Sequence, residues 1–295
     1  MKHIVLILSV CLLLGSQIAC CTIMLPSIPD IRINVPVKVG EMQSRQETVP
    51  LSETELATVE VLFGSGSLKV KAGDSDDLFS GRFRYNIEEW EPQVTYKDGV
   101  LVVEQGGSPI SPPGDVRNTW ELEFSPEIPL EMDLKAVGAL GDMDFTGLQL
   151  TRLDLDLGAG DFDVRFDKPN GVEMSNLTLD AGASQLNVTG IGNAGPKRMT
   201  VQGGAGEITL DFTGAWPQSA DVRITAGVGA ITLYLPDDVG VRVEPEGKLT
   251  NVNVDGLRRR GSAYVNDAFG EAETELRIKV TTGFGTLHLA EVRNH

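Results

Sequence analysis

Chemically reactive side chains are scarce in this chain. All three cysteines lie within the first 21 residues, and of the three histidines only His288 and His295 lie beyond the N-terminal segment. A body without cysteine has no disulfide framework and no thiolate metal site. The sequence also lacks a Gly-x-Ser-x-Gly elbow, a His-Glu-x-x-His motif and a phosphate-binding loop. We therefore expect no nucleophilic catalysis, no metal site and no cofactor.

Positive charge is also in short supply. The chain has 25 Lys and Arg against 42 Asp and Glu, for a formal net charge of −17 at pH 7. Such a surface repels a phosphate backbone, so the composition argues against a nucleic-acid partner. The one basic cluster in the sequence consists of Arg258, Arg259 and Arg260. These three arginines could contact anionic lipid headgroups or a wall polymer, or they could form a solvated loop tip.

Only one long apolar run occurs, and it is at the N-terminus. Ile4–Leu14 follows Lys2 and is shorter than the roughly 20 residues that a membrane span needs. We expect a signal peptide over residues 1–19 and a body that lies outside the cytoplasm. Residues 20–50, which contain several prolines, are expected to form a tether.

The segment Gln17-Ile18-Ala19-Cys20 resembles a bacterial lipoprotein box, although Gln17 stands where that family usually has Leu. The resemblance implies cleavage before Cys20, acylation of its thiol and a membrane lipid as the partner of the anchored protein. Cys21 is the alternative acylation site. Plain secretion, with both cysteines incidental, is the alternative to anchoring.

The body is dominated by alternation of apolar and polar residues, and helical periodicity is absent. In Leu153–Phe166, leucines alternate with aspartates, Gly158-Ala159-Gly160 follows, and alternation resumes at Phe162. This pattern predicts a strand, a tight corner and a second strand, each strand with one buried face.

The strand-corner-strand unit recurs along the chain. Aligned on the second corner residue, the units are centred on Gly66, Gly141, Gly160, Ser184, Gly206, Gly229 and Gly285. The middle units are 19 to 24 residues apart, which predicts coils stacked as a solenoid. The alignment places one apolar column inside the stack: Met143, Phe162, Leu186, Ile208, Ile231 and Leu287.

The Gly-x-Gly-acidic-apolar-x-apolar repeat resembles the toast-rack β-solenoid domains of bacterial envelope proteins. Phe83–Pro92 and Asn118–Leu122 look like the N-terminal part of that family, and the resemblance extends over about Val49–Leu289. It implies an all-β, single-chain β-solenoid with an N-terminal region over 51–135 and a C-terminal region over 136–295. Relatives include LiaF-like proteins of the envelope-stress response and adhesin-like proteins. This chain lacks the membrane helices of LiaF-like proteins.

Two further groups of residues are candidate sites. Trp90, among three glutamates, could bind a sugar or a protein, or it could pack at the edge of the core; Trp120 lies in an alternating strand and is expected in the core. Asp142, Asp161 and Glu207 could stack as one outward column. Carboxylates about 5–9 Å apart can serve glycoside hydrolysis, whereas exposed acids more often form a solvated face.

Three functional hypotheses follow. The first is a lipid-anchored, non-catalytic envelope protein with a binding or scaffold role. A part in sensing envelope stress is one form of this hypothesis. The second is an adhesin-like module that binds polysaccharide, and the third is a glycan-active enzyme. An envelope protein or a wall polysaccharide is the expected partner, and the oligomeric state stays open.

Overall fold

The computed structural model describes residues 38–52, 54–74, 76–108 and 114–294. All of them belong to the second of two compact units, Val37–His295. The predicted signal peptide and both cysteines of the lipoprotein box lie outside the described residues.

Nearly all regular structure in the described residues is strand. Two short helical turns occur, η1 (Glu88–Trp90) and α2 (Ile191–Ala194). The strands are β1 (Val39–Pro50), β2 (Ala57–Ala72), β3 (Asp77–Ile87), β4 (Pro92–Lys97), β5 (Val100–Gln105), β6 (Asn118–Phe124), β7 (Pro129–Asp144), β8 (Gln149–Arg165), β9 (Asn176–Thr189), β10 (Arg198–Asp211), β11 (Ala220–Pro236), β12 (Gly240–Asp255), β13 (Arg258–Arg260), β14 (Ala263–Val265) and β15 (Glu275–Val292).

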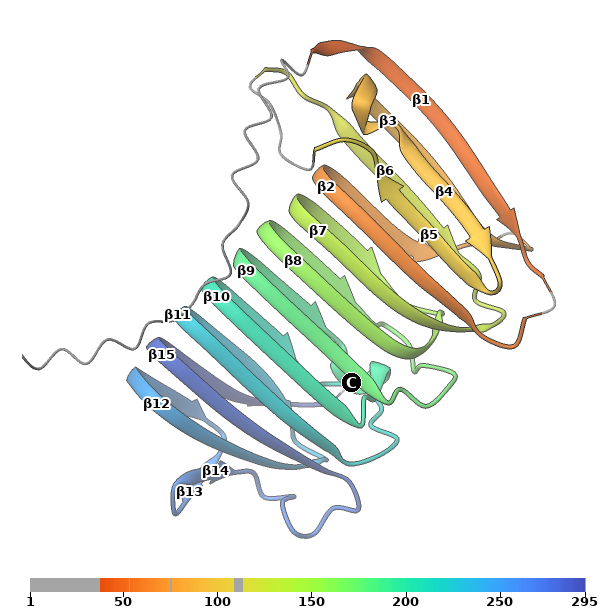
Figure 1. The fold of residues 1–295 in the computed structure, drawn as a ribbon. Helices are drawn as coiled ribbons and strands as arrows, with labels where there is room; N and C mark the ends of the chain where they lie inside the picture. Colours follow the sequence, from red (N-terminus) through yellow and green to blue (C-terminus); the bar gives the residue numbers. More distant parts are fainter. Residues whose placement is uncertain (1–37, 53, 75, 109–113, 295) are drawn as a thin grey trace, which may run out of the picture. The chain divides into compact units, whose positions relative to one another are not determined.

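One open sheet joins these strands in the order β1-β3-β6-β2-β7-β8-β9-β10-β11-β15-β12-β14-β13, with β4 and β5 paired to each other beside β2. The long strands from β2 to β12 are parallel and lie side by side as the bars of a rack (Figure 1). The predicted all-β stack of rungs, each made of strand, corner and strand, is confirmed.

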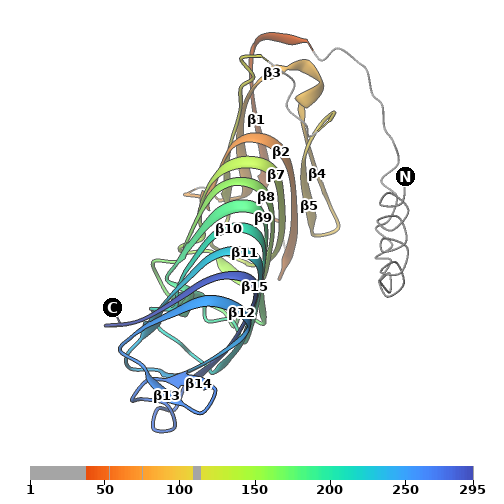
Figure 2. The same cartoon turned by 90° about the vertical axis from the view of Figure 1, so that its left-hand side faces the viewer.

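Each long strand bends at its corner (Figure 2). One side of both arms is buried in the core. In β11 the buried residues before the corner are Val222 and Ile224, and those after it are Ile231 and Leu233. The buried positions change from even to odd numbers, so the corner contains one extra residue. Without that residue, strand alternation would turn the second arm's apolar side chains toward solvent.

At Gly160 and Gly229, glycine at the second corner position is required by close approach of the neighbouring rung. Gly160 and Gly229 have φ values of +145° and +149°. A Cβ atom on either residue would lie 1.8 Å from a backbone carbonyl oxygen of the preceding rung, that of Ala139 or Gly206. An L side chain at these corners therefore forces the rungs apart.

The register differs from the sequence alignment on β7. Ala139, not Gly141, is the corner partner of Gly160, so Met143 pairs with Val164 instead of joining the column of Phe162. Gly141 itself pairs with Phe162, and a Cβ at Gly141 would lie 2.6 Å from the Phe162 ring. Gly141 is thus a packing glycine that makes room for a large neighbour. All five side chains predicted to line the stack are buried: Met143, Phe162, Leu186, Ile208 and Ile231.

The last strand does not extend the stack. β15 inserts between β11 and β12, so the sequence order of the rungs is broken at the C-terminal end of the sheet. The interval between the corners at Gly229 and Gly285 therefore contains β12 and the short β13–β14 hairpin. The chain then returns to the position between β11 and β12, where it forms β15.

The predicted tether over residues 20–50 is too long. Val39–Pro50 is strand β1, which pairs antiparallel with β3 at the edge of the sheet. Most side chains of β1 are exposed on both faces of this edge strand, which explains why the sequence shows no apolar periodicity here.

Trp120 of β6 is fully buried, as expected, and packs edge-on against Phe63 and Phe83.

Candidate functional site

A groove of about 560 Å³ lies on the outward face of the first arms of β10, β11, β15 and β12. Outward residues here alternate with the core residues Met199, Val222 and Ile278. We call this feature the basic groove, because its charged lining consists of five cations and two carboxylates: Arg198, Arg223, Arg242, Arg277 and Lys279, with Asp221 and Glu244. In a chain with a net charge of −17, this concentration of cations is a local reversal of sign.

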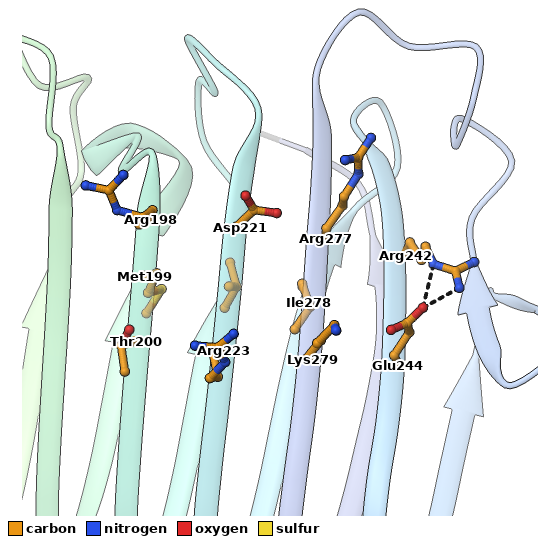
Figure 3. A pocket seen from close by; sticks show the side chains of 11 residues that line it. Arg198, Met199, Thr200, Asp221, Arg223, Arg242, Glu244, Arg277, Ile278 and Lys279 are labelled. Carbon is orange, nitrogen blue, oxygen red and sulfur yellow. Dashed lines mark hydrogen bonds and ion pairs between the residues drawn. The ribbon is translucent and has the colours of Figure 1, made fainter.

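The groove side chains form two rows that run across the strands (Figure 3). In strand order the first row is Arg198, Asp221, Arg277 and Arg242, and the second is Thr200, Arg223, Lys279 and Glu244. Each row therefore contains two cations on adjacent strands, which lie about 4.8 Å apart. Like charges directly opposite on neighbouring strands destabilise a sheet, so this arrangement has a cost in folding free energy.

Nearby carboxylates neutralise two of the five cations. Arg242 Nε donates to Glu244 Oε1 at 3.0 Å, and Arg277 Nη2 donates to Glu275 Oε2 at 2.9 Å. The hydrogen bond from Arg242 lowers the pKa of the Glu244 carboxyl, and the charges of Arg242 and Lys279 lower it further. Among the described residues, Arg198, Arg223 and Lys279 form no ion pair, so the groove keeps an uncompensated positive charge.

Sequence reasoning missed the basic groove, although a signal was present. Arg223 and Lys279 each lie six residues before their second corner glycine, and Arg198 and Arg277 each lie eight before theirs. Aligning the residues that precede the corners, as well as those that follow, would have placed these cations in rows. The order of β15 and β12 could not have been found in this way.

The basic cluster seen in the sequence is exposed, as a binding surface or a solvated tip would both require. Arg258, Arg259 and Arg260 make up strand β13, and all three side chains are exposed. Arg258 makes an ion pair with Asp267 at 2.6 Å, and Arg259 Nε donates to the carbonyl oxygen of Gly261 at 3.3 Å. The cluster therefore lies on an edge strand of the sheet and not in an irregular loop.

Register and strand alternation place the three arginines on two different faces of the hairpin. By register, the first row of the groove continues from Arg242 through Val265 of β14 to Arg258. Arg259 instead pairs with Tyr264, the partner of the core residue Val243. Because successive side chains of a strand point to opposite faces, Arg258 and Arg260 share the face of the basic groove, and Arg259 faces the other way.

Trp90 is not a surface aromatic. It lies in η1, is only 1% exposed, and its indole Nε1 donates to the carbonyl oxygen of Ser108 at 2.8 Å. A buried ring with its polar atom already bonded cannot contact a ligand, so the alternative of edge packing is the correct one. The neighbouring glutamates suggested an exposed position for Trp90. They are exposed on the outer side of the turn, whereas the tryptophan side chain is buried.

The three candidate carboxylates do not form one column. Asp142 pairs in register with Asp163 and makes an ion pair with Arg165 at 2.8 Å, two positions away from the row of Asp161. Asp161 and Glu207 do share a row, with Gln185 between them, but both are exposed on a shallow surface near the corners. The expected column was an effect of the misplaced corner at Gly141.

The predicted lipid anchor lies outside the described part of the chain, so it stays a prediction. Cys20 and the alternative Cys21 lie outside the described residues. Within the described ranges, no helix has the length and apolar character to cross a membrane. The same ranges contain no group of three or more His, Cys, Asp or Glu side chains placed to hold a metal ion.

Comparison with solved structures gives several similar chains. A "putative cell adhesion protein" from Clostridium sporogenes is 22% identical, with a TM-score of 0.47, and the match covers 85% of this chain and 100% of that one. A "putative adhesin" from Bacteroides fragilis is 16% identical, with a TM-score of 0.39 and coverage of 85% and 97%. A "putative lipid binding protein" from Parabacteroides distasonis is 10% identical, with a TM-score of 0.36 and coverage of 86% and 98%.

No curated protein matches the chain. A family model does: the N-terminal domain of toast_rack, DUF2154, matches residues 38–189 and 170–234. These matches span more than half of the sequence, and they include the corners from Gly66 to Gly229. The chain belongs to the toast_rack family.

Proposed function

We propose that this protein is a non-catalytic binding or scaffold protein of the cell envelope, held to a membrane by an acylated Cys20. The observation that carries the binding role is the basic groove, an open surface with cations on four adjacent strands. An anionic partner would offset the repulsion between the adjacent cations Arg223 and Lys279.

A glycan-active enzyme is the weaker alternative. A glycosidase needs two carboxylates facing each other across the sugar, and it orients that sugar in an enclosing cleft. Asp161 and Glu207 lie on the same open face and project from it side by side. Their arrangement supports a solvated surface better than a pair of catalytic acids.

The anchor rests on the lipoprotein box and is tested in the native host. Wild-type protein is expected in the membrane fraction, and Cys20→Ser in the soluble extracytoplasmic fraction. Cys21→Ser is the matched control and should stay with the membrane. Unchanged fractionation of Cys20→Ser would refute anchoring at this residue, and a shift of Cys21→Ser alone would move the acylation site by one position.

The binding role is tested separately from the anchor. Purified protein is mixed with envelope fragments from the host, and the bound fraction is measured after sedimentation. We expect saturable binding that weakens as salt is raised. A part in envelope stress, which the resemblance to LiaF-like proteins supports, predicts that deletion changes the induction of a stress reporter by a wall-active antibiotic; unchanged induction would remove that part of the proposal.

A further inference from the structure

We infer that the basic groove binds a linear anionic sugar polymer, with carboxylate or phosphate groups, that lies across the strands and reaches Arg258 and Arg260 of β13. This inference deepens the proposed binding role and does not depend on the lipid anchor. It assigns the partner's chemistry, its direction on the sheet and the residues that contact it.

Like charges lie side by side in the groove. Arg223 lies beside Lys279 and neither forms an ion pair among the described residues, whereas the adjacent Arg277 and Arg242 are each paired with a glutamate. An anionic group placed between two such cations converts a repulsive pair into two attractive contacts. Arginine suits this role, because its planar guanidinium can hold a carboxylate or a phosphate by two parallel hydrogen bonds.

The cations of the groove also recur at a regular spacing. Rows perpendicular to the strands place cations about 4.8 Å apart on adjacent strands, or twice that distance where one strand intervenes. Arg198 and Arg277 are separated in this way by Asp221 of β11. By register the row continues through the buried Val265 to Arg258, whose side chain is paired with the exposed Asp267. A ladder of this kind matches repeated anionic groups along a chain better than one small anion.

The residues of the groove favour a polymer over a bilayer. Its exposed and half-exposed residues are charged or polar, and its apolar lining residues Met199, Val222 and Ile278 are buried. The exposed large apolar side chains of the same strands, Val228 at 57%, Phe284 at 59% and Tyr234 at 37% exposure, do not line the groove. A bilayer contact would use those apolar side chains, whereas a thin polymer fits the groove itself. A wide nucleic-acid duplex would bring its phosphates against the acidic remainder of the chain.

The test uses the full-length protein and three probes: oligogalacturonates of defined length, neutral dextran of matched length, and vesicles of phosphatidylglycerol. The groove variant is Arg223→Gln with Lys279→Gln. Its matched control is Lys97→Gln with Lys168→Gln, which removes the same charge from exposed positions outside the groove. Affinity is measured by fluorescence anisotropy at two salt concentrations.

We expect oligogalacturonate to bind, dextran not to bind, and affinity to fall as salt is raised. Because the groove variant loses two charge-assisted contacts to the polymer, its affinity should fall by about tenfold or more. The control variant should stay within about twofold of wild type, since long-range screening leaves only a small effect of distant charges.

The hairpin offers a test of how far the polymer extends. Arg258→Gln with Arg260→Gln should weaken binding of long oligomers and leave short ones unchanged. Arg259→Gln is the matched control within the same strand, because its side chain lies on the opposite face, and it should change neither. Equal affinity of the double variant for long oligomers, or an equal loss from Arg259→Gln, would overturn the extension to β13.

A measurement of thermal stability shows whether the groove variant loses affinity because it is less well folded. The groove variant removes a repulsive pair, so its thermal midpoint should equal or exceed that of wild type. Lower stability together with lower affinity would overturn the argument from like-charge repulsion.

The remaining outcomes are also decisive. If the groove variant and wild type bind oligogalacturonate equally, the site is elsewhere and the inference fails, even if envelope binding stands. If vesicles bind through Arg223 and Lys279 and oligogalacturonate does not, the partner is a lipid surface and the assignment of a sugar polymer is overturned. Loss of envelope binding with intact oligogalacturonate binding would instead count against the broader proposed function.

Discussion

The contact between Gly141 and Phe162 gives a sharp test of the rung register. A Cβ added at Gly141 would lie 2.6 Å from Phe162 Cδ1 and 3.0 Å from the terminal methyl of Met143. The methyl can move, but the ring is held in the core, being 1% exposed. Overpacking of this kind costs about 1–3 kcal/mol, and the stiffer unfolded chain of a Gly→Ala variant offsets about 0.4–1 kcal/mol. Gly141→Ala should therefore lower the free energy of unfolding by about 1–2 kcal/mol.

A second substitution shows whether the ring is the cause. Phe162→Val removes the ring atoms in question and should cost roughly 2–4 kcal/mol by leaving a cavity. In the double variant the new methyl group enters that cavity. We expect the double variant to be more stable than the sum of the single effects by about 1 kcal/mol, a coupling within the usual range for touching residues.

Urea unfolding followed by circular dichroism and by tryptophan fluorescence measures this cycle. Gly138→Ala is the matched control on the same strand, because a Cβ there would meet only Ser65 Oγ at 3.4 Å and a carbonyl oxygen at 4.0 Å. It should change stability little and add independently to Phe162→Val. If Gly141→Ala and Phe162→Val were also additive within about 0.5 kcal/mol, the register with Gly141 beside Phe162 would be refuted.

Two further predictions concern a corner and a carboxyl group. Gly229→Ala should destabilise by at least about 1–2 kcal/mol through its positive φ, whereas Ser184→Ala, at the same row of a rung that already has a side chain, should be nearly neutral; thermal unfolding of both variants measures the difference. Burial, together with three neighbouring aspartates, raises the pKa of Glu291 in the folded state. Its ionisation therefore opposes folding at pH 7, and stability is regained as pH falls through the raised pKa toward the ordinary value. Glu291→Gln should stabilise the protein at pH 7 and lose that advantage near pH 4; an equal gain at both values would contradict this reasoning.

Where a residue's conformation is set by its own rung, the sequence was a reliable guide. The corner at Gly160 and the buried alternation on both sides of it are local, and both were predicted correctly. The failure at Gly141 has a physical reason. Glycine is used in this fold for two purposes, the close approach of rungs and room for a large side chain, and a sequence shows only the glycine. The sequence alignment also missed Ala139, because it occupies the corner position of β7 without being glycine.

The candidate site was harder to predict, since it depends on which rungs are neighbours. If β12 followed β11 directly in the same register, Asp221 would face Arg242 and Arg223 would face Glu244, which are complementary pairs. Insertion of β15 replaces both contacts with neighbours that include Arg277 and Lys279. The strand order thus decides whether Arg223 lies beside Glu244 or beside Lys279. The contacts among these charges are a property of topology, and a count of acids and bases along the chain, however acidic its total, cannot reveal them.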